Sequence, residues 1–153
     1  MASTAKFHTA GRRLFNQIFN KAVSPLTTIY LGLRTLDGVG SHPADAANGD
    51  TLGNATTLAE VSSTSTGYAR QAITVNSTNL AETLSDPDSL LTFIQKTFNF
   101  TGAGLPVNGI THAFIASTSD NTGVLIASAP LSAVVNAAEG YSLAETFTFK
   151  MSA

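Results

Sequence analysis

The sequence predicts a mainly β protein, an antiparallel β-sandwich or jelly-roll-like fold with an amphipathic helix at its N-terminus. Two observations carry this prediction. Several short segments alternate apolar and polar residues with a period of two, which is typical of half-buried strands. A clear helical period occurs only near the start of the chain. One helix followed by six or seven short strands with irregular connections favours a sandwich that the helix flanks.

A chain of 153 residues is long enough for one hydrophobic core, so we expect a single domain spanning 1–153. Its expected parts are an N-terminal helix (4–23), a first strand (27–35), a long loop (36–57) and a β-rich remainder (58–153).

The predicted helix over 4–23 rests on one apolar stripe at helical spacing. The stripe consists of Phe7, Gly11, Leu14, Phe15, Ile18, Phe19 and Ala22. Ser3 or Thr4 is placed to cap the helix start, and Ser24-Pro25 is expected to end it. The preferred interpretation is that the stripe packs on the protein's own sheet. The alternative is that it docks on a partner or on a membrane surface.

Half of the basic residues lie in or beside this helix, namely Lys6, Arg12, Arg13 and Lys21. The first acidic residue in the chain is Asp37. We therefore predict that these four cations bind a partner whose surface is acidic. Four cations without an aromatic platform are a weak signal for nucleic acid, so no nucleic-acid partner is expected.

Residues 27–35 predict the first strand, with Ile29, Leu31 and Leu33 pointing inward and Arg34 on the opposite face. The segment 36–57 that follows is rich in turn-forming pairs. A loop of this length is unusual in a compact domain and is often functional, so it is a second candidate for partner contact.

A strand over 67–75 organises the predicted sheet. Tyr68 and Arg70 are two residues apart and therefore share a face. We predict structural roles for both residues. Arg70 is expected to be at least half buried and to contact the Tyr68 ring or a carboxylate.

Further strands are predicted over 91–101, 110–116, 124–131 and 143–151. The alternation in the first of these breaks near Gln95-Lys96, where we expect a bulge or the end of the strand. The stretch Ser85–Asp88 predicts a turn or a capped helical turn. Asp86 and Asp88 are candidates for acid–base or calcium chemistry, but Ser85 and Pro87 beside them favour a helix cap.

The sequence contains no pattern typical of an enzyme. It has no cysteine, and its three histidines lack metal-ligand spacing. Its serines do not form a G-x-S-x-G motif. We therefore predict no catalytic, cofactor or metal site. No apolar run approaches the roughly 18 residues of a membrane span, so no membrane partner is expected.

Charged residues make up 12% of the chain, against roughly 25% in ordinary domains. Ser and Thr fill the difference, with 36 positions. Few charges leave strand edges poorly protected against self-association. The composition predicts a homo-oligomer, a trimer or a dimer formed through polar strand-edge contacts. A secreted β protein would have a similar composition.

The order of motifs along the chain resembles a family of small structural proteins of tailed bacteriophages. In order, the matching segments are Ile29-Tyr30-Leu31-Gly32-Leu33-Arg34-Thr35, Gly67-Tyr68-Ala69-Arg70-Gln71-Ala72, Gly109-Ile110-Thr111-His112-Ala113-Phe114-Ile115 and Gly123-Val124-Leu125. The resemblance covers roughly residues 10–150. The chain differs from the family in its long 36–57 loop and in lacking a tryptophan before the Ile110 strand.

The resemblance implies a non-enzymatic virion structural protein, assembled in the host cytoplasm, with no catalytic residues. It implies an accessory, decoration (cement) subunit bound to the major capsid protein or to a tail protein of the same virion. The alternative is a tail-fibre or receptor-binding module, or a carbohydrate-binding domain. Three tyrosines and no tryptophan weaken the carbohydrate-binding alternative.

Overall fold

The computed structural model describes residues 6–35, 59–85 and 88–151. The described residues contain one helix and ten strands: β1 (Lys6–Phe7), α1 (Thr9–Phe19), β2 (Thr28–Thr35), β3 (Gln71–Thr74), β4 (Leu80–Ser85), β5 (Asp88–Phe93), β6 (Lys96–Asn99), β7 (Val107–Ala116), β8 (Leu125–Ala137), β9 (Ser142–Glu145) and β10 (Thr148–Met151).

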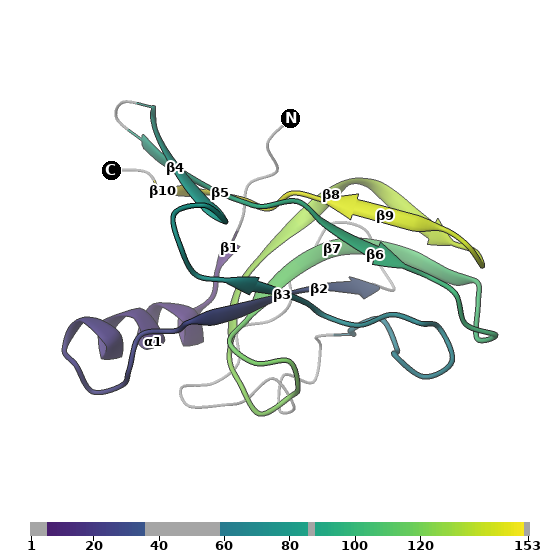
Figure 1. Ribbon diagram of the computed structural model, residues 1–153, viewed down its shortest axis with the longest axis horizontal. Helices are drawn as coiled ribbons and strands as arrows, with labels where there is room; N and C mark the ends of the chain where they lie inside the picture. The colour runs from purple at the N-terminus through teal and green to yellow at the C-terminus, as the bar shows by residue number, and fades with distance from the viewer. Residues whose placement is uncertain (1–5, 36–58, 86–87, 152–153) are drawn as a thin grey trace.

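The fold is mainly β and sandwich-like, as the sequence predicted. One layer is a five-stranded antiparallel sheet in the order β1-β8-β7-β2-β3. The second group of strands consists of a three-stranded sheet, β10-β5-β4, and a two-stranded sheet, β6-β9. Figure 1 shows β6 and β9 lying over β7 and β2, while the β4–β5 hairpin and α1 project from the same end of the molecule.

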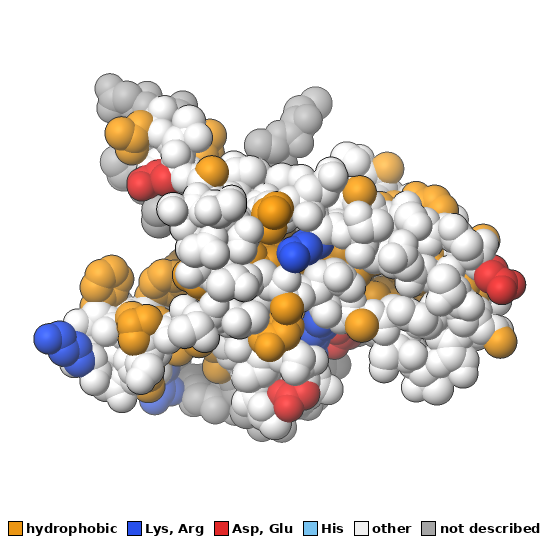
Figure 2. Space-filling view, viewed as in Figure 1, with side chains coloured by type: hydrophobic (Ala, Val, Ile, Leu, Met, Phe, Trp, Pro, Cys, Tyr) orange, Lys and Arg blue, Asp and Glu red, His pale blue; other side chains and the backbone are white. Residues whose placement is uncertain are grey.

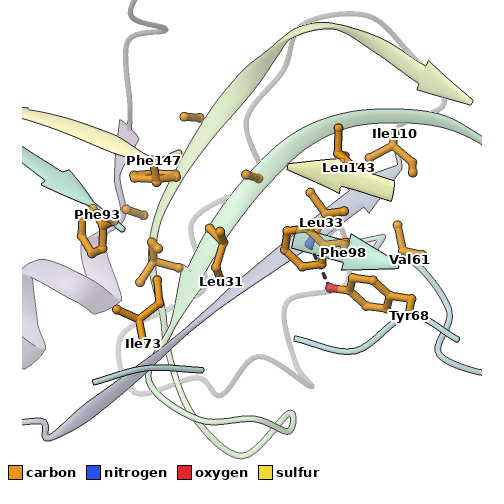
Figure 3. Close-up of a cluster of buried hydrophobic side chains, with 14 of the residues drawn as sticks. Leu31, Leu33, Val61, Tyr68, Ile73, Phe93, Phe98, Ile110, Leu143 and Phe147 are labelled. Carbon is orange, nitrogen blue, oxygen red and sulfur yellow. Dashed lines mark hydrogen bonds between the residues drawn. The ribbon is translucent and has the colours of Figure 1, made fainter. Parts of the chain in front are cut away.

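The core lies between these layers, and both contribute side chains to it (Figure 3). Leu31, Leu33 and Ile110 come from the five-stranded sheet, and each is fully buried. Phe98 and Leu143 face them from β6 and β9. Burying such a side chain stabilises the fold by about 1.5–3 kcal/mol, so these strands hold the two layers together.

The first predicted strand is confirmed: β2 spans Thr28–Thr35, and Ile29, Leu31 and Leu33 are buried. Arg34, predicted on the other face, is buried as well, with 1% of its surface exposed. β2 is an inner strand, hydrogen-bonded to β3 on one edge and to β7 on the other, and it is buried on both faces around Arg34. The predicted loop over 36–57 lies outside the described residues.

Two long predicted strands are each divided in the structure. Residues 91–101 were predicted as one strand, but β5 ends at Phe93 and β6 begins at Lys96, close to the expected break. The predicted strand over 143–151 divides into β9 and β10 in the same way. The Phe93 N–H donates a hydrogen bond of 2.9 Å to the Phe147 carbonyl where the two strands pass each other. At the break the chain therefore passes from the three-stranded sheet, where β5 pairs with β10, to the two-stranded sheet, where β6 pairs with β9.

Of the two interpretations of Ser85–Asp88, the helix cap is wrong and the turn agrees with the pairing of the strands on either side. β4 and β5 form an antiparallel hairpin in which Ser85 pairs with Asp88. The sequence pattern is ambiguous because the same residue types favour tight turns and helix N-termini.

The helix is shorter than the predicted 4–23. Lys6 and Phe7 form β1, which pairs with Ser128 and Ala127 of β8. The helix begins after His8, whose side chain makes no capping hydrogen bond, rather than after Ser3 or Thr4. It ends at Phe19, before Ser24-Pro25. The residues before the helix satisfy their backbone groups by extending the sheet, which helical periodicity alone does not reveal.

The first turn of α1 is fixed tightly on the edge of the sheet. Gly11 is buried, and a Cβ at this position would lie 2.5 Å from the Ile126 carbonyl oxygen. The His8 N–H donates to the same carbonyl at 2.9 Å. The absence of a side chain at Gly11 therefore permits the helix to approach the β8 backbone.

The second half of α1 leaves the sheet. Phe15 is 43% exposed and Phe19 is 82% exposed. The expectation that the whole apolar stripe packs on the protein's own sheet is therefore wrong for Phe19, whereas Phe15 still contacts Phe7 of β1. In Figure 2, hydrophobic side chains lie at the surface where the helix projects.

Candidate functional site

The densest polar cluster in the described part of the chain surrounds Arg70, at the start of the segment that leads into β3. The Arg70 Nε and Nη2 atoms donate to the two carboxylate oxygens of Glu60 at 2.8 and 2.5 Å. Nη2 also donates to Asn121 Oδ1 at 2.8 Å. Nη1 donates to the carbonyls of Thr118, at 3.1 Å, and Asp120. All five guanidinium N–H groups are therefore engaged.

The Arg70 side chain is only 4% exposed, and its guanidinium lies 5.4 Å from the centre of the Phe114 ring. The expected contact with a carboxylate is present, with Glu60 as the partner. The expected ring contact is made with Phe114 rather than with Tyr68. A bidentate pair held in this way is geometrically specific as well as strong.

Tyr68 joins the same cluster to the sheet. Its hydroxyl donates to Glu60 Oε1 at 2.9 Å and accepts a hydrogen bond from the Leu33 N–H at 2.9 Å, the contact drawn in Figure 3. Its ring stacks on Phe98 with centroids 5.8 Å apart. Burial, followed by the nearby Glu60 carboxylate, raises the pKa of the Tyr68 hydroxyl well above its ordinary value. The hydroxyl therefore stays neutral and serves as a fixed hydrogen-bonding group.

Backbone geometry before the strand brings Tyr68 and Arg70 into place. Gly67 adopts a positive φ of 76°, and a Cβ there would lie 2.5 Å from Thr101 Oγ1. The Tyr68 N–H donates to Thr66 Oγ1 at 3.1 Å. β3 itself begins only at Gln71, so the predicted strand over 67–75 is shorter in the structure.

The loop between β7 and β8 closes the cluster from the other side. Asp120 Oδ1 accepts hydrogen bonds from the Thr122 N–H and hydroxyl at 2.9 and 2.6 Å. These bonds lower the pKa of the Asp120 carboxyl. The loop is therefore held in the shape that turns its carbonyls towards Arg70.

An open hollow of about 620 Å³ borders the cluster. The polar residues around it include Glu60, Ser62, Ser63, Arg70, Asp120 and Asn121. Arg70 already uses every donor on protein acceptors. The arrangement ties three segments of the chain together, and its chemistry is that of a structural ion pair.

The four cations predicted to bind a partner lie on different elements and differ in exposure. Lys6 is half-buried in β1, whereas Arg12 and Arg13 are exposed on α1. Arg12 Nη2 donates to Thr9 Oγ1 at 3.1 Å. Lys21 is exposed beyond the helix end, with a positive φ of 61°.

A second surface is apolar and lies at the end of α1. We call it the helix-end surface, and it surrounds a hollow of about 580 Å³. Its residues are Ile18, Phe19, Lys21, Ala22, Val23 and Pro25. Phe19 and Val23 expose 82% and 36% of their surface, and Lys21 places one cation at the margin.

Phe15 lies on α1 just before the helix-end surface, and a series of aromatic rings links it to the core. Its ring meets Phe7 edge to face at 5.3 Å, and Phe7 meets Phe149 at 5.2 Å. Phe149 in turn lies 6.2 Å from Phe147. Each aromatic contact of this kind contributes roughly 0.5–1.5 kcal/mol, so the projecting helix has a defined position relative to β10.

One important residue was missed in the sequence. Glu60 is not among the predicted site residues, yet it receives hydrogen bonds from both Tyr68 and Arg70. Its isolated bridge to Arg34 is what aligns it. Arg34 is itself buried, which lowers its pKa. The only sequence signal for Glu60 is that it is an acid between the apolar Leu58 and Val61.

Within the described ranges, no group of three or more His, Cys, Asp or Glu side chains is placed to hold a metal ion. No helix in those ranges is long and apolar enough to cross a membrane.

No protein-family model matches the chain, and a search of curated proteins finds no significant match.

Proposed function

We propose that this chain is a non-enzymatic structural protein of a tailed-bacteriophage virion, an accessory or decoration (cement) subunit bound to the capsid or tail surface. The order of motifs along the chain, which resembles that of small structural proteins of tailed bacteriophages, supports this proposal. The observation that carries it further is the helix-end surface, where a helix fixed to the sheet at Gly11 presents Phe19, 82% exposed, away from its own core. A rigid apolar projection of this kind suits attachment to a larger assembly.

The charges around the helix favour an acidic partner surface. Arg12, Arg13 and Lys21 are exposed, and no acid precedes Asp37 in the sequence. Exposed ion pairs contribute only about 0–1 kcal/mol each, so buried apolar area would supply most of the attachment. The partner that fits is the major capsid protein or a tail protein of the same particle.

The first experiment is mass spectrometry of gradient-purified particles from the phage or prophage that encodes this chain. We expect the protein in the particle fraction at a stoichiometric level. Its recovery only among unassembled soluble proteins would contradict the proposal. Cryo-EM of the same particles would then distinguish attachment to the head from attachment to the tail.

A salt wash separates burial from charge as the source of attachment. At about 1 M salt the Debye length falls to about 3 Å, so exposed ion pairs are screened. We expect weakened attachment with part of the protein still sedimenting with the particles. Complete release at moderate salt would mean that charge holds the subunit.

The second candidate is a tail-fibre or carbohydrate-binding module. One exposed aromatic side chain favours testing it: Tyr141 is 39% exposed and lies beside the buried Phe100, with ring centroids 6.5 Å apart. A glycan array with the recombinant protein and with Tyr141→Ala decides it. Glycan binding that Tyr141→Ala removes would favour this candidate, and no binding would leave the accessory subunit.

A further inference from the structure

Two projections extend from the same end of the molecule, and their surfaces are complementary. One is α1 with the helix-end surface, and the other is the β4–β5 hairpin (Figure 1). The two are separated in space within one chain, so neither covers the other. Each exposes a large apolar side chain almost completely, Phe19 at 82% and Leu84 at 81%.

The hairpin carries an acidic residue next to its apolar one. Glu82 and Leu84 are two residues apart on β4 and therefore project from the same face. Both are exposed, and Ser89 donates a hydrogen bond of 2.9 Å to Glu82 Oε1, which orients the carboxylate. We call these two residues the hairpin surface. Figure 2 shows an acidic side chain beside hydrophobic ones on this projection.

The helix-end surface is also apolar, but its charged residue is basic. Its hollow is lined by the apolar side chains of Phe19, Val23 and their neighbours, with Lys21 at its margin. A leucine side chain can insert into an apolar hollow of this kind, and a carboxylate one strand repeat away, at roughly 6–7 Å, can meet the lysine. The two surfaces therefore match in both apolar character and charge.

We propose that the hairpin surface of one copy of this chain docks on the helix-end surface of a second copy, so that the protein forms a two-fold dimer. Because both projections lie at the same end, a two-fold axis between them pairs hairpin with helix twice. A closed dimer of this kind buries all four exposed apolar side chains and makes each contact doubly. This contact uses side chains and is distinct from strand-edge pairing. It occupies the same helix-end surface as the proposed attachment to a particle, so the dimer is the form of the free protein and the two partners compete for that surface.

The chain contains no cysteine, so introduced thiols report the contact without background. Phe19→Cys and Leu84→Cys are prepared as separate proteins with tags of different mass, mixed and oxidised mildly. Disulfide formation between two different chains excludes a link within one chain. We expect the mixed disulfide to dominate over the two self-linked products.

The matched control is Val134→Cys, which is 54% exposed. It lies near the C-terminal end of β8, whereas α1 contacts β8 near its N-terminal end, at Ile126. Leu84→Cys mixed with Val134→Cys should link at least about tenfold more slowly, since random collision alone brings these thiols together. Equal rates for the two mixtures would overturn the proposal. Preferential linking of Leu84→Cys with Ala81→Cys would also overturn it, because that pattern indicates pairing of two β4 edges.

Sedimentation equilibrium of the unmodified protein gives the second measurement. We expect a mass approaching twice the 15.8 kDa of one chain. Phe19→Ser should weaken association about a thousandfold, because the two-fold dimer loses two buried phenyl rings at about thirtyfold each. Glu82→Lys should weaken association about two- to fivefold, and adding Lys21→Glu should restore it. A monomer at concentrations up to about 1 mM would overturn the dimer.

Discussion

The Arg70 cluster and the helix-end surface are opposites in chemistry and in placement. Arg70 is 4% exposed and has every donor satisfied within the chain. Phe19 is 82% exposed and has few neighbours of its own. The burial predicted for Arg70 is thus confirmed, while Phe19, whose spacing in the helix is equally typical of a core residue, is turned outward. Residue type alone therefore does not identify the interacting surface.

The comparison predicts opposite responses to mutation. Changes in the Arg70 cluster should affect folding, and changes at the helix end should affect association.

Arg70→Ala should lower the free energy of unfolding by about 3–5 kcal/mol. The substitution removes the Arg70 donors from the Glu60 carboxylate and the Thr118 carbonyl, and of the hydrogen bonds described at Glu60 only that from the Tyr68 hydroxyl stays. Urea unfolding measures the loss. Arg70→Lys is the control, because it keeps the charge but loses the bidentate fork. Its free energy of unfolding should lie between those of the wild type and Arg70→Ala. An unchanged urea midpoint for Arg70→Ala would show that the cluster does not stabilise the fold.

Gly11→Ala should cost about 1–3 kcal/mol, because the new Cβ would lie 2.5 Å from a backbone oxygen that cannot move aside easily. The sign is informative, since alanine is otherwise favoured over glycine in a helix by about 1 kcal/mol. Asn16→Ala, at an exposed position of the same helix, is the matched control and should not destabilise. If Gly11→Ala is stabilising in thermal unfolding, the close packing of α1 on Ile126 is wrong.

Tyr68→Phe should cost about 1–3 kcal/mol at neutral pH, since the Leu33 N–H loses its acceptor. Because the pKa of the Tyr68 hydroxyl is raised in the folded state, the stability from this group is complete below its unfolded value of about pH 10. It is lost as the pH rises through the raised pKa. The difference between wild type and Tyr68→Phe should therefore narrow in strongly alkaline urea titrations, and a constant difference would contradict this account.

Phe19→Ser should change the free energy of unfolding by no more than about 0.5 kcal/mol, because the side chain is 82% exposed. Thermal unfolding of the dilute, monomeric protein checks this. Phe98→Ser, at a fully buried ring of β6, is the contrasting control and should prevent stable folding. A large loss for Phe19→Ser would place its ring in the core.

The predictable parts of the molecule are those where periodicity has one solution. β2 was predicted nearly to the residue because Ile29, Leu31 and Leu33 alternate and are covered on one side by the second layer. The break near Gln95-Lys96 was also visible, because the alternation itself stops there. In such segments the local pattern and the tertiary environment agree.

The remaining features depend on partners distant in sequence. Glu60 and Arg70 meet because β2 aligns the segment around Glu60, and no local pattern records that pairing. The helix stripe has the same spacing whether its second half is covered or exposed. The structure shows the first turn held against Ile126 at Gly11 and Phe19 exposed, a difference that the spacing does not record.

Hydrogen–deuterium exchange of the wild-type protein at low and high concentration tests the contrast between the two regions most directly. We expect peptides covering 9–25 and 80–85 to exchange more slowly as concentration rises, because these projections become buried against a second copy. Peptides covering 59–70 and 117–123 should exchange at the same rate at both concentrations, since the Arg70 cluster is complete within one chain. Concentration-dependent protection around Arg70, with none at the two projections, would contradict the account.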